Sequence, residues 1–198
     1  MEPIVDFKIL PERLRQAAQV VTVAVASPAD SHTEEVIERS IAEQFARFIL
    51  VANAAKADIA RRLAADYPDK VTLIVAEDDD DAARHAVKEV REGRADVLMK
   101  GSLNTDNLLR AVLNKEEGIL IKGSVLTHIA VADVPSLNHL LFFTDAAVIP
   151  YPTTEQYDAI TRYITDTYRS ITGGDRPGAV VPTSIPATVA PPKRVIVL

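Results

Sequence analysis

The residues best suited to chemistry form a polar loop, from Lys100 to Thr105, between two apolar segments. Residues 95–100 contain the apolar run Val-Leu-Met and predict a strand, and residues 105–113 carry leucines at helical spacing. In an open α/β sheet, ligands bind outside the carboxyl ends of the strands, which is where such a loop lies. The sequence therefore predicts a ligand-binding loop at this strand end.

The composition of this loop favours an anion such as phosphate. Lys100 supplies a positive charge, and Gly101 lets a ligand approach the backbone closely. Ser102, Asn104 and Thr105 supply hydrogen-bond donors, and the free N–H groups at a helix start add to them. The loop is not of the Walker A type, because the G-x-x-x-x-G-K-[ST] spacing is absent. The alternative is that Asn104 or Thr105 only caps the helix.

An acidic run, Glu77 to Asp81, raises the question of a metal site. The run stands at the start of a predicted helix over residues 79–91, where the helix dipole stabilises carboxylates. The glycine and distal glutamate of a calcium-binding EF-hand loop do not follow it. The pattern therefore favours helix stabilisation over metal binding.

A second group of polar residues lies further along the chain. The histidines are His32, His85, His128 and His139, without paired metal-ligand spacing. His128 stands next to Thr127 in an apolar segment, which favours a structural role. Ser102, His128 and Asp145 would suit a catalytic triad, but such a trio is expected by chance and no G-x-S-x-G motif supports it. Asp145 follows the predicted strand at 140–144, and there it either faces a cleft or binds nearby backbone N–H groups.

Strand and helix patterns alternate through the first 118 residues, after a predicted opening helix at 10–18. This alternation predicts an α/β fold, a three-layer open, mostly parallel sheet with helices on both faces. The predicted strands cover 20–26, 48–52, 71–76 and 95–100, and the predicted helices cover 31–46, 54–67, 79–91 and 105–113.

The pattern changes after Gly118. Residues 119–121 and 125–132 predict either a hairpin or an antiparallel excursion around Gly123, within about 119–135. Further predictions are strands at 140–144 and 147–149, a helix at 153–171 with Tyr157, Ile160, Ile164 and Tyr168 inward, and a strand-like end at 195–198 without a partner. A Pro- and Gly-rich stretch then suggests one domain at 1–172 and an irregular tail at 173–198.

Composition narrows the classes of function. The net charge is −6 and no Lys/Arg run occurs, so a nucleic-acid partner is not expected. The absence of cysteine excludes disulfides and thiol catalysis. The first residues lack the pattern of a signal peptide, and no apolar run reaches the length of a membrane span. These observations lead us to expect a cytoplasmic protein without a membrane partner.

Three segments, in this order, resemble one family. They are Ala95–Gly101 followed by Asn104 and Thr105, Gly123–His128, and Thr144–Ala147 followed by Pro150. Phosphate butyryltransferases carry similar AD-x-LMKG-x-x-x-T, G-x-x-LSH and TDAA segments. The start of the last helix, Pro152–Gln156, also resembles phosphate acetyltransferases. From about Val20 to Ile171 the chain thus resembles the N-terminal part of the phosphate acetyl/butyryl transferase family, most closely the phosphate butyryltransferases.

The resemblance implies a reversible reaction in which acyl-CoA and phosphate give acyl phosphate and CoA. It further implies coenzyme A as a substrate, no tightly bound cofactor or metal, a homodimer, and a first domain like that of isocitrate/isopropylmalate dehydrogenases. It assigns no catalytic residue. The substrate- and phosphate-binding residues that it implies are Lys100, Gly101, Ser102, Asn104, Thr105, Lys122, Ser124, Thr127, His128 and Asp145.

The sequence departs from the family pattern in three places. Where the family has Arg before the glycine of its second segment, this chain has Ile121 and Lys122, so Lys122 is the candidate substitute. Where the family often has Asn after TDAA-x, Ile149 stands. Family members also carry a second α/β domain that forms the other wall of the cleft. We therefore expect weak activity from this chain alone; the alternative is a non-catalytic module that binds a small anion, CoA or a partner chain.

Overall fold

The computed structural model describes residues 4, 6–16, 20–134, 136–137, 139–145, 147–149, 151–173 and 195–197. The chain divides into two compact units. Unit 1 comprises Met1–Arg13 and Ile121–Lys193, and unit 2 comprises Leu14–Leu120 and Arg194–Leu198. The predicted boundary at 172/173 stays a prediction, because most of the predicted tail lies outside the described residues.

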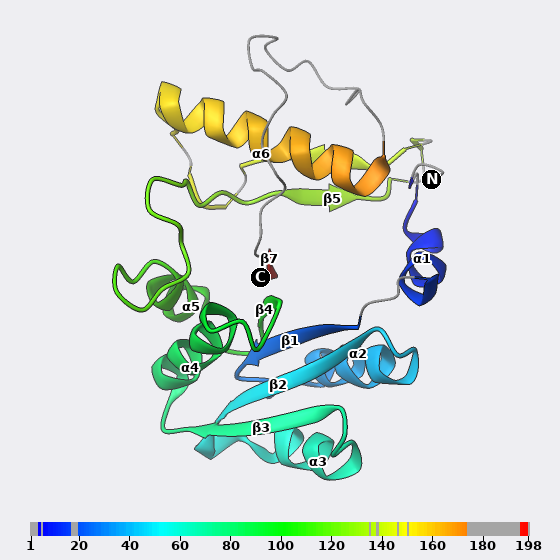
Figure 1. The fold of residues 1–198 in the computed structure, drawn as a ribbon, viewed down its shortest axis with the longest axis vertical. Coiled ribbons are helices and arrows are strands. Elements are labelled where there is room, and N and C mark those ends of the chain that lie inside the picture. Colours follow the sequence, from blue (N-terminus) through cyan, green and yellow to red (C-terminus); the bar gives the residue numbers. More distant parts are fainter. Residues whose placement is uncertain are drawn as a thin grey trace. The chain divides into compact units, whose positions relative to one another are not determined.

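A parallel sheet organises unit 2 (Figure 1). Its strands are β1 (Val21–Ala26), β2 (Ala46–Asn53), β3 (Val71–Ala76), β4 (Val97–Lys100) and β7 (Val195–Val197). They lie in the order β3-β2-β1-β4-β7, and every neighbouring pair is parallel. Near-continuous apolar runs such as Val23–Ala26 form the central strands because both faces of a parallel sheet are covered.

Helices cover both faces of this sheet. The helical elements of unit 2 after β1 are α2 (Ser31–Ala42), η2 (Ala54–Lys56), α3 (Asp58–Asp66), α4 (Asp79–Arg91) and α5 (Thr105–Val112). Side chains of α2 and α3 pack in one core cluster with β1 and β2, and side chains of α4 and α5 pack in another. The predicted three-layer α/β arrangement is therefore confirmed for unit 2.

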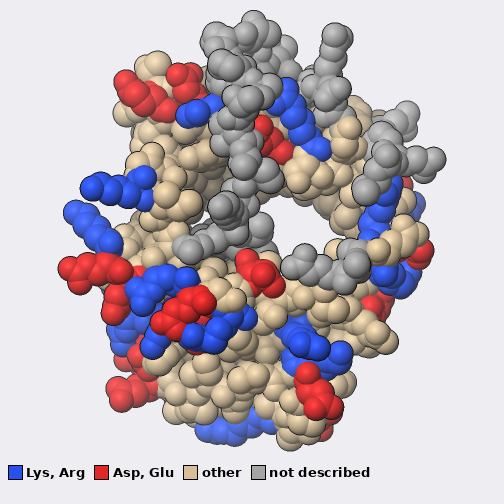
Figure 2. All heavy atoms as spheres, in the orientation of Figure 1, with Lys and Arg blue, Asp and Glu red and all other residues tan. Residues whose placement is uncertain are grey.

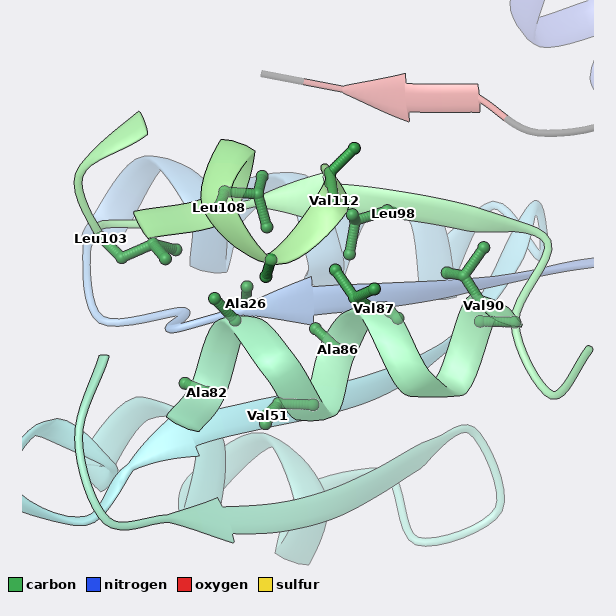
Figure 3. Close-up of a cluster of buried hydrophobic side chains, with 14 of the residues drawn as sticks. Ala26, Val51, Ala82, Ala86, Val87, Val90, Leu98, Leu103, Leu108 and Val112 are labelled. Carbon is green, nitrogen blue, oxygen red and sulfur yellow. The ribbon is translucent and has the colours of Figure 1, made fainter. Parts of the chain in front are cut away.

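The α4–α5 side of the sheet has a tightly filled core (Figure 3). Small residues of α4, such as Ala82 and Ala86, let that helix approach β1 and β2 closely, while Leu98 and Leu108 fill the space toward α5. Leu98, Leu103 and Leu108 are at most 2 % exposed. This core fixes both ends of the loop that joins β4 to α5.

Unit 1 is built from shorter elements. Beside η1 (Phe7–Ile9) and the start of α1 (Leu10–Gln16), it contains β5 (Ala130–Ala132), β6 (Leu141–Phe143) and α6 (Thr154–Thr172). β5 and β6 form a two-stranded antiparallel sheet, and Phe142 packs edge-on against Tyr168 of α6 at 5.1 Å between ring centroids. Thr153 and Gln156 form the capping box that begins α6.

Several predicted elements need correction. The antiparallel excursion is present, but β5 pairs with β6, and residues 119–129 contain no strand; the predicted hairpin around Gly123 is wrong. Gly123 instead sits in a turn with φ +84°, closed by the hydrogen bond from Ser124 N–H to Ile121 C=O. Residues 147–149 form no strand, because the N–H groups of Ala147 and Val148 bind Asp145 instead.

Helix ends and one helix face also differ from the predictions. α2 ends at Ala42, since Gln44 has φ +61° and Ala46 already begins β2. Tyr157 of α6 was predicted to face inward but is 52 % exposed, whereas Ile160 of the same helix is buried as predicted. The residues after position 16 of the predicted opening helix lie outside the described part.

The C-terminal strand has a partner, contrary to the prediction. β7 pairs in parallel with β4 along Val97–Met99. The edge of β4 offers unpaired backbone groups, and an extended β-branched segment can satisfy them. The segment between Gly173 and β7 lies outside the described residues.

Candidate functional site

The predicted loop, Lys100 to Thr105, lies at the topological switch point of the unit 2 sheet. β1 is central, with β2 on one side and β4 on the other. The chain leaves β1 toward the helices of one face and leaves β4 toward α5 on the opposite face. In open α/β sheets, ligands bind in the crevice that this divergence creates at the carboxyl ends. The loop is thus placed where the sequence predicted it.

The first turn of the loop rests on the end of β1. Gly101 N–H donates to Ala26 C=O at 2.9 Å, and Ser102 donates to Ser27 C=O through both its N–H (2.8 Å) and its hydroxyl (2.9 Å). A Cβ atom on Gly101 would lie 2.4 Å from the Ser27 carbonyl oxygen. Glycine is therefore required at position 101 for packing against backbone.

Lys100 stabilises the same turn through hydrogen bonds of its side chain to the backbone of the loop. Its half-buried side chain donates from Nζ to the carbonyl oxygens of Gly101 at 3.1 Å and Leu103 at 3.2 Å. An ammonium group has three donors, so one remains for a ligand. The positive charge is present as predicted, but it also holds the loop together.

The uncommitted donors lie at the start of α5. Asn104 occupies the N-cap position and makes no side-chain capping bond, so its side chain is available to a ligand. Asn104 and Thr105 are both exposed, and the N–H groups of Leu103, Asn104 and Thr105 have no acceptor among the described residues. Free N–H groups at a helix start favour an anion, although the exposed Asp106 carboxylate stands in the same turn.

A polar network that the sequence analysis missed joins three neighbouring strand ends. Asp79 accepts from Ser27 Oγ at 3.1 Å and Asn53 Nδ2 at 3.0 Å on one oxygen, and from Lys56 Nζ at 2.9 Å on the other. Burial opposes ionisation, but these donors outweigh it and lower the pKa of Asp79. We call these four residues the strand-end network. The signal was available, because Ser27 and Asn53 stand at predicted strand ends and Asp79 starts the helix after a third.

Asp78, Asp80 and Asp81 of this run lie at the start of α4, where the sequence predicted helix stabilisation. Asp78 is the N-cap and accepts from Asp81 N–H at 2.8 Å, and Asp81 accepts from Glu77 N–H at 3.1 Å. Asp80 accepts from Asn107 Nδ2 at 2.6 Å, which links the starts of α4 and α5. Each of these carboxylates thus has a structural partner.

A second polar cluster centres on Asp145 in unit 1. One carboxylate oxygen accepts from the Thr127 hydroxyl at 2.7 Å and from His128 N–H at 3.2 Å. The other accepts from Ala147 N–H at 3.0 Å and Val148 N–H at 2.8 Å. Partial burial opposes ionisation, but these four donors outweigh it and hold the pKa of Asp145 far below its ordinary value.

This cluster favours the second interpretation of Asp145, in which its carboxylate binds nearby backbone N–H groups. Thr144 Oγ1 donates to His128 C=O at 2.6 Å, so the segment before β5 and the end of β6 are tied at several points. Asp145 therefore acts as an acceptor for backbone N–H groups. It binds the backbone of His128, and His128 Nδ1 is buried without a partner among the described residues. The His–Asp side-chain bond of a triad is absent from this cluster.

Lys122 and Ser124 flank the Gly123 turn of the same unit. Lys122 is exposed and Ser124 is half-buried, and neither side chain has a hydrogen bond within the described part of unit 1. The ten predicted binding residues thus fall into two groups, the loop from Lys100 to Thr105 in unit 2 and the residues from Lys122 to Asp145 in unit 1. The assignment of both groups to one cleft stays a prediction.

Other features of the surface lie apart from these residues. A groove of about 240 Å³ between α4 and α5 is lined by His85, Lys88 and Asn114, among others, and by none of the ten predicted residues. On the face shown in Figure 2, basic side chains are interspersed with acidic ones. In the described part of the chain, no group of three His, Asp or Glu residues is arranged to hold a metal ion. No described helix is long and apolar enough to cross a membrane.

Comparisons with known proteins identify the family of the chain. A family model described as phosphate acetyl/butaryl transferase matches residues 69–181. Phosphate butyryltransferase of Clostridium beijerinckii is 40 % identical over 144 residues, which cover 71 % of this chain and 47 % of the relative. Probable phosphate butyryltransferase of Bacillus subtilis is 36 % identical over 135 residues, which cover 68 % and 44 %.

The fold comparison points the same way. A branched-chain phosphotransacylase from Enterococcus faecalis superposes with a TM-score of 0.62 at 22 % identity, covering 76 % of this chain and 51 % of that one. The chain spans less than half the length of the two butyryltransferases. The family model, together with the sequence relatives, shows that the chain belongs to the phosphate acetyl/butyryl transferase family.

Proposed function

We propose that this chain is part of a phosphate acyltransferase that converts acyl-CoA and phosphate into acyl phosphate and CoA, with butyryl or a similar short acyl group. Family membership supports the reaction. The observation that carries the role of the loop is the row of uncommitted N–H groups at Leu103, Asn104 and Thr105, at the switch point of the sheet. These donors suit the oxygens of phosphate or of an acyl phosphate.

In the proposed reaction, a phosphate oxygen attacks the thioester carbonyl carbon, the C–S bond breaks, and CoA leaves as the thiolate. Phosphate is already a nucleophile, so no covalent acyl-enzyme is needed. The loop would contribute by holding phosphate in position and by neutralising charge, with Asn104, Thr105 and the third donor of Lys100 as ligands. Gly101 and Ser102 would shape the site, since their N–H groups already bind β1 and its following residue.

The residues of unit 1 have two proposed roles. Lys122 and Ser124 would contact substrate, because their side chains have no partner within the described part of unit 1. Thr127, His128 and Asp145 would hold that segment in shape through their mutual hydrogen bonds. Coenzyme A enters as a substrate, and we propose no tightly bound cofactor.

Four further proposals concern the protein as a whole. They are a homodimer, a cytoplasmic location, a first domain over 1–172 followed by a tail at 173–198 that contains β7, and a fold like the first domain of isocitrate/isopropylmalate dehydrogenases. The parallel sheet with helices on both faces supports the last of these. Size-exclusion chromatography with light scattering tests the dimer.

A second candidate function is a non-catalytic α/β module that binds a small anion, CoA or a partner chain. The observation that favours it is the row of uncommitted N–H groups at Leu103, Asn104 and Thr105, which suits a small anion whether or not a reaction follows. Release of free thiol from butyryl-CoA in the presence of phosphate separates the two functions. Phosphate-dependent release by the 198-residue chain supports the transferase, and binding of CoA or phosphate without release supports the module.

The loop assignment is tested by binding of inorganic phosphate, followed through the amide resonances of residues 101–106. Thr105→Val removes an exposed hydroxyl at the loop, and Thr72→Val removes an exposed hydroxyl on β3 as a matched control. We expect Thr105→Val to raise the phosphate Kd several-fold, by the loss of about 1 kcal/mol, and Thr72→Val to leave it unchanged. Equal phosphate binding by the parent, Thr105→Val and Asn104→Ala would refute the assignment.

A further inference from the structure

Within the described residues, hydrogen bonds join the strand-end network (Ser27, Asn53, Lys56 and Asp79) to the loop through Ser27. Ser27 is 1 % exposed and has φ +56°, a conformation that non-glycine residues seldom adopt without support. Its N–H donates to Val51 C=O at 2.8 Å, and its hydroxyl donates to Asp79 at 3.1 Å. Three anchors, β1, β2 and the start of α4, therefore hold this one residue.

The carbonyl group of Ser27 is in turn the support of the loop. It accepts both the N–H and the hydroxyl of Ser102, and it fills the space that a Cβ on Gly101 would need. A rotation of the Ser27 peptide would break both bonds to Ser102 together. Ser27 therefore connects Asp79 to the loop, because its hydroxyl binds Asp79 and its carbonyl group binds Ser102.

We infer that Asp79 is a positioning residue for phosphate, which sets the Gly101–Ser102 turn by holding Ser27 in its left-handed conformation. This inference rests on the proposed function for its substrate and on the hydrogen bonds for its geometry. Asp79 lies outside the loop and would not touch the ligand. Asn53 and Lys56 keep its carboxylate in place, with one oxygen shared by Ser27 and Asn53 and the other bound to Lys56.

Substitutions at Asp79 separate this role from helix stabilisation. Asp79→Ala removes the acceptor, and Asp79→Asn keeps one amide oxygen for the Ser27 hydroxyl. Asp81→Asn is the matched control, because Asp81 lies in the same first turn of α4 and accepts from Glu77 and Arg84 without a bond to Ser27. The Asp79 and Asp81 variants each remove one negative charge from the start of α4. A difference between their effects therefore reports the influence of Asp79 on the loop rather than on the helix.

Two readouts are needed. Amide hydrogen exchange at Ser102 reports the bond to Ser27 directly, and inorganic phosphate titration reports the ligand site. We expect Asp79→Ala to speed exchange at Ser102 and to raise the phosphate Kd, each about tenfold, which corresponds to about 1.4 kcal/mol. Asp79→Asn should recover part of both effects, and Asp81→Asn should change both less than about twofold, or about 0.4 kcal/mol.

A double-variant cycle completes the test. Ser27→Ala removes the hydroxyl that reaches Asp79, so Ser27→Ala and the Ser27→Ala/Asp79→Asn pair should show equal exchange at Ser102 if the two residues act through one bond. Unchanged exchange at Ser102 in Asp79→Asn and Ser27→Ala would overturn the inference, even if Asp79→Ala fails to fold. Changed exchange with no phosphate binding by the parent chain would leave the geometric link intact and refute the phosphate site instead.

Discussion

The two units of this chain hold their polar residues in place by different means. In unit 2, a parallel sheet with helices on both faces buries residues such as Leu50, Leu98 and Leu108 completely, and the loop after β4 is anchored at both ends by that core. In unit 1, the strands have three residues each, and the buried apolar residues within its described part are Leu140, Ala159 and Ile160.

Hydrogen bonds replace apolar packing in unit 1. Asp145 accepts four of them, from Thr127, His128, Ala147 and Val148. A tightly packed core loses stability when a side chain is shortened, because a cavity remains. A carboxylate that accepts several hydrogen bonds costs stability when its charge is removed, because its donors lose their partner. Substitutions that remove volume should therefore have the largest effect on stability, and substitutions at glycines, at the charged Asp145 and at helix caps should have progressively smaller effects.

The largest expected effect comes from truncating leucine in each sheet. Leu50→Ala, at a fully buried site in β2, should reduce the free energy of unfolding of unit 2 by about 3–4 kcal/mol, because it leaves a cavity. Leu141→Ala, at a site in β6 that is 41 % exposed, should cost unit 1 less than about 1 kcal/mol. Hydrogen exchange within each unit measures both values. Equal losses would contradict the difference in packing.

Glycine substitution gives the next effect. Gly101→Ala places a Cβ 2.4 Å from the Ser27 carbonyl oxygen and should cost unit 2 about 2–3 kcal/mol, with displacement of the loop. Gly123→Ala meets no atom within 4 Å but requires φ +84°, so it should cost unit 1 about 1 kcal/mol. Urea unfolding followed by exchange at residues of each unit compares them. If Gly101→Ala lost less free energy of unfolding than Gly123→Ala, the backbone after β1 would have to move aside at little cost.

The negative charge of Asp145 should stabilise unit 1 alone, and only at pH values at which the carboxyl group is ionised. Asp145→Asn should reduce the free energy of unfolding of unit 1 by about 2 kcal/mol at pH 7, because donors to a charged acceptor lose their partner. The folded pKa of Asp145 is lowered, so the stabilisation is fully present above the unfolded pKa of about 4 and is lost as pH falls toward the folded value. The gap between parent and variant should therefore narrow below about pH 4. If the difference in free energy of unfolding between parent and variant did not change with pH, the charge of Asp145 would not be the source of the stabilisation.

Helix caps give the smallest expected difference. Thr153→Ala removes the capping box of α6 and should cost about 1 kcal/mol. Asn104→Ala removes a side chain that makes no capping bond at α5 and should cost less than about 0.5 kcal/mol, while weakening phosphate binding. Thermal unfolding and phosphate titration of both variants measure the two quantities. A destabilised Asn104→Ala with unchanged phosphate affinity would return Asn104 to a capping role.

Much of unit 2 could be predicted because its signals are local. Continuous β-branched runs predicted β1 and β3 to within one residue at each end, and the acidic start of residues 79–91 predicted α4 with the correct bounds. Unit 1 was predicted less well. A short apolar run is compatible with either a strand or a turn. In addition, β5 pairs with β6, and the sequence pattern of β5 does not specify its partner.

By itself, the sequence determined the α/β class, the family and the position of the loop after β4, since periodicity and short motifs lie within a few residues of one another. Only the tertiary structure decided which donors of the loop are free. Ser102 donates to the Ser27 carbonyl group and Lys100 commits two of its three donors to carbonyl groups, whereas Asn104 and Thr105 make no such bond. The physical reason is separation along the chain: Ser27 meets Asp79 and Ser102 across 52 and 75 positions, and no local pattern specifies such a contact.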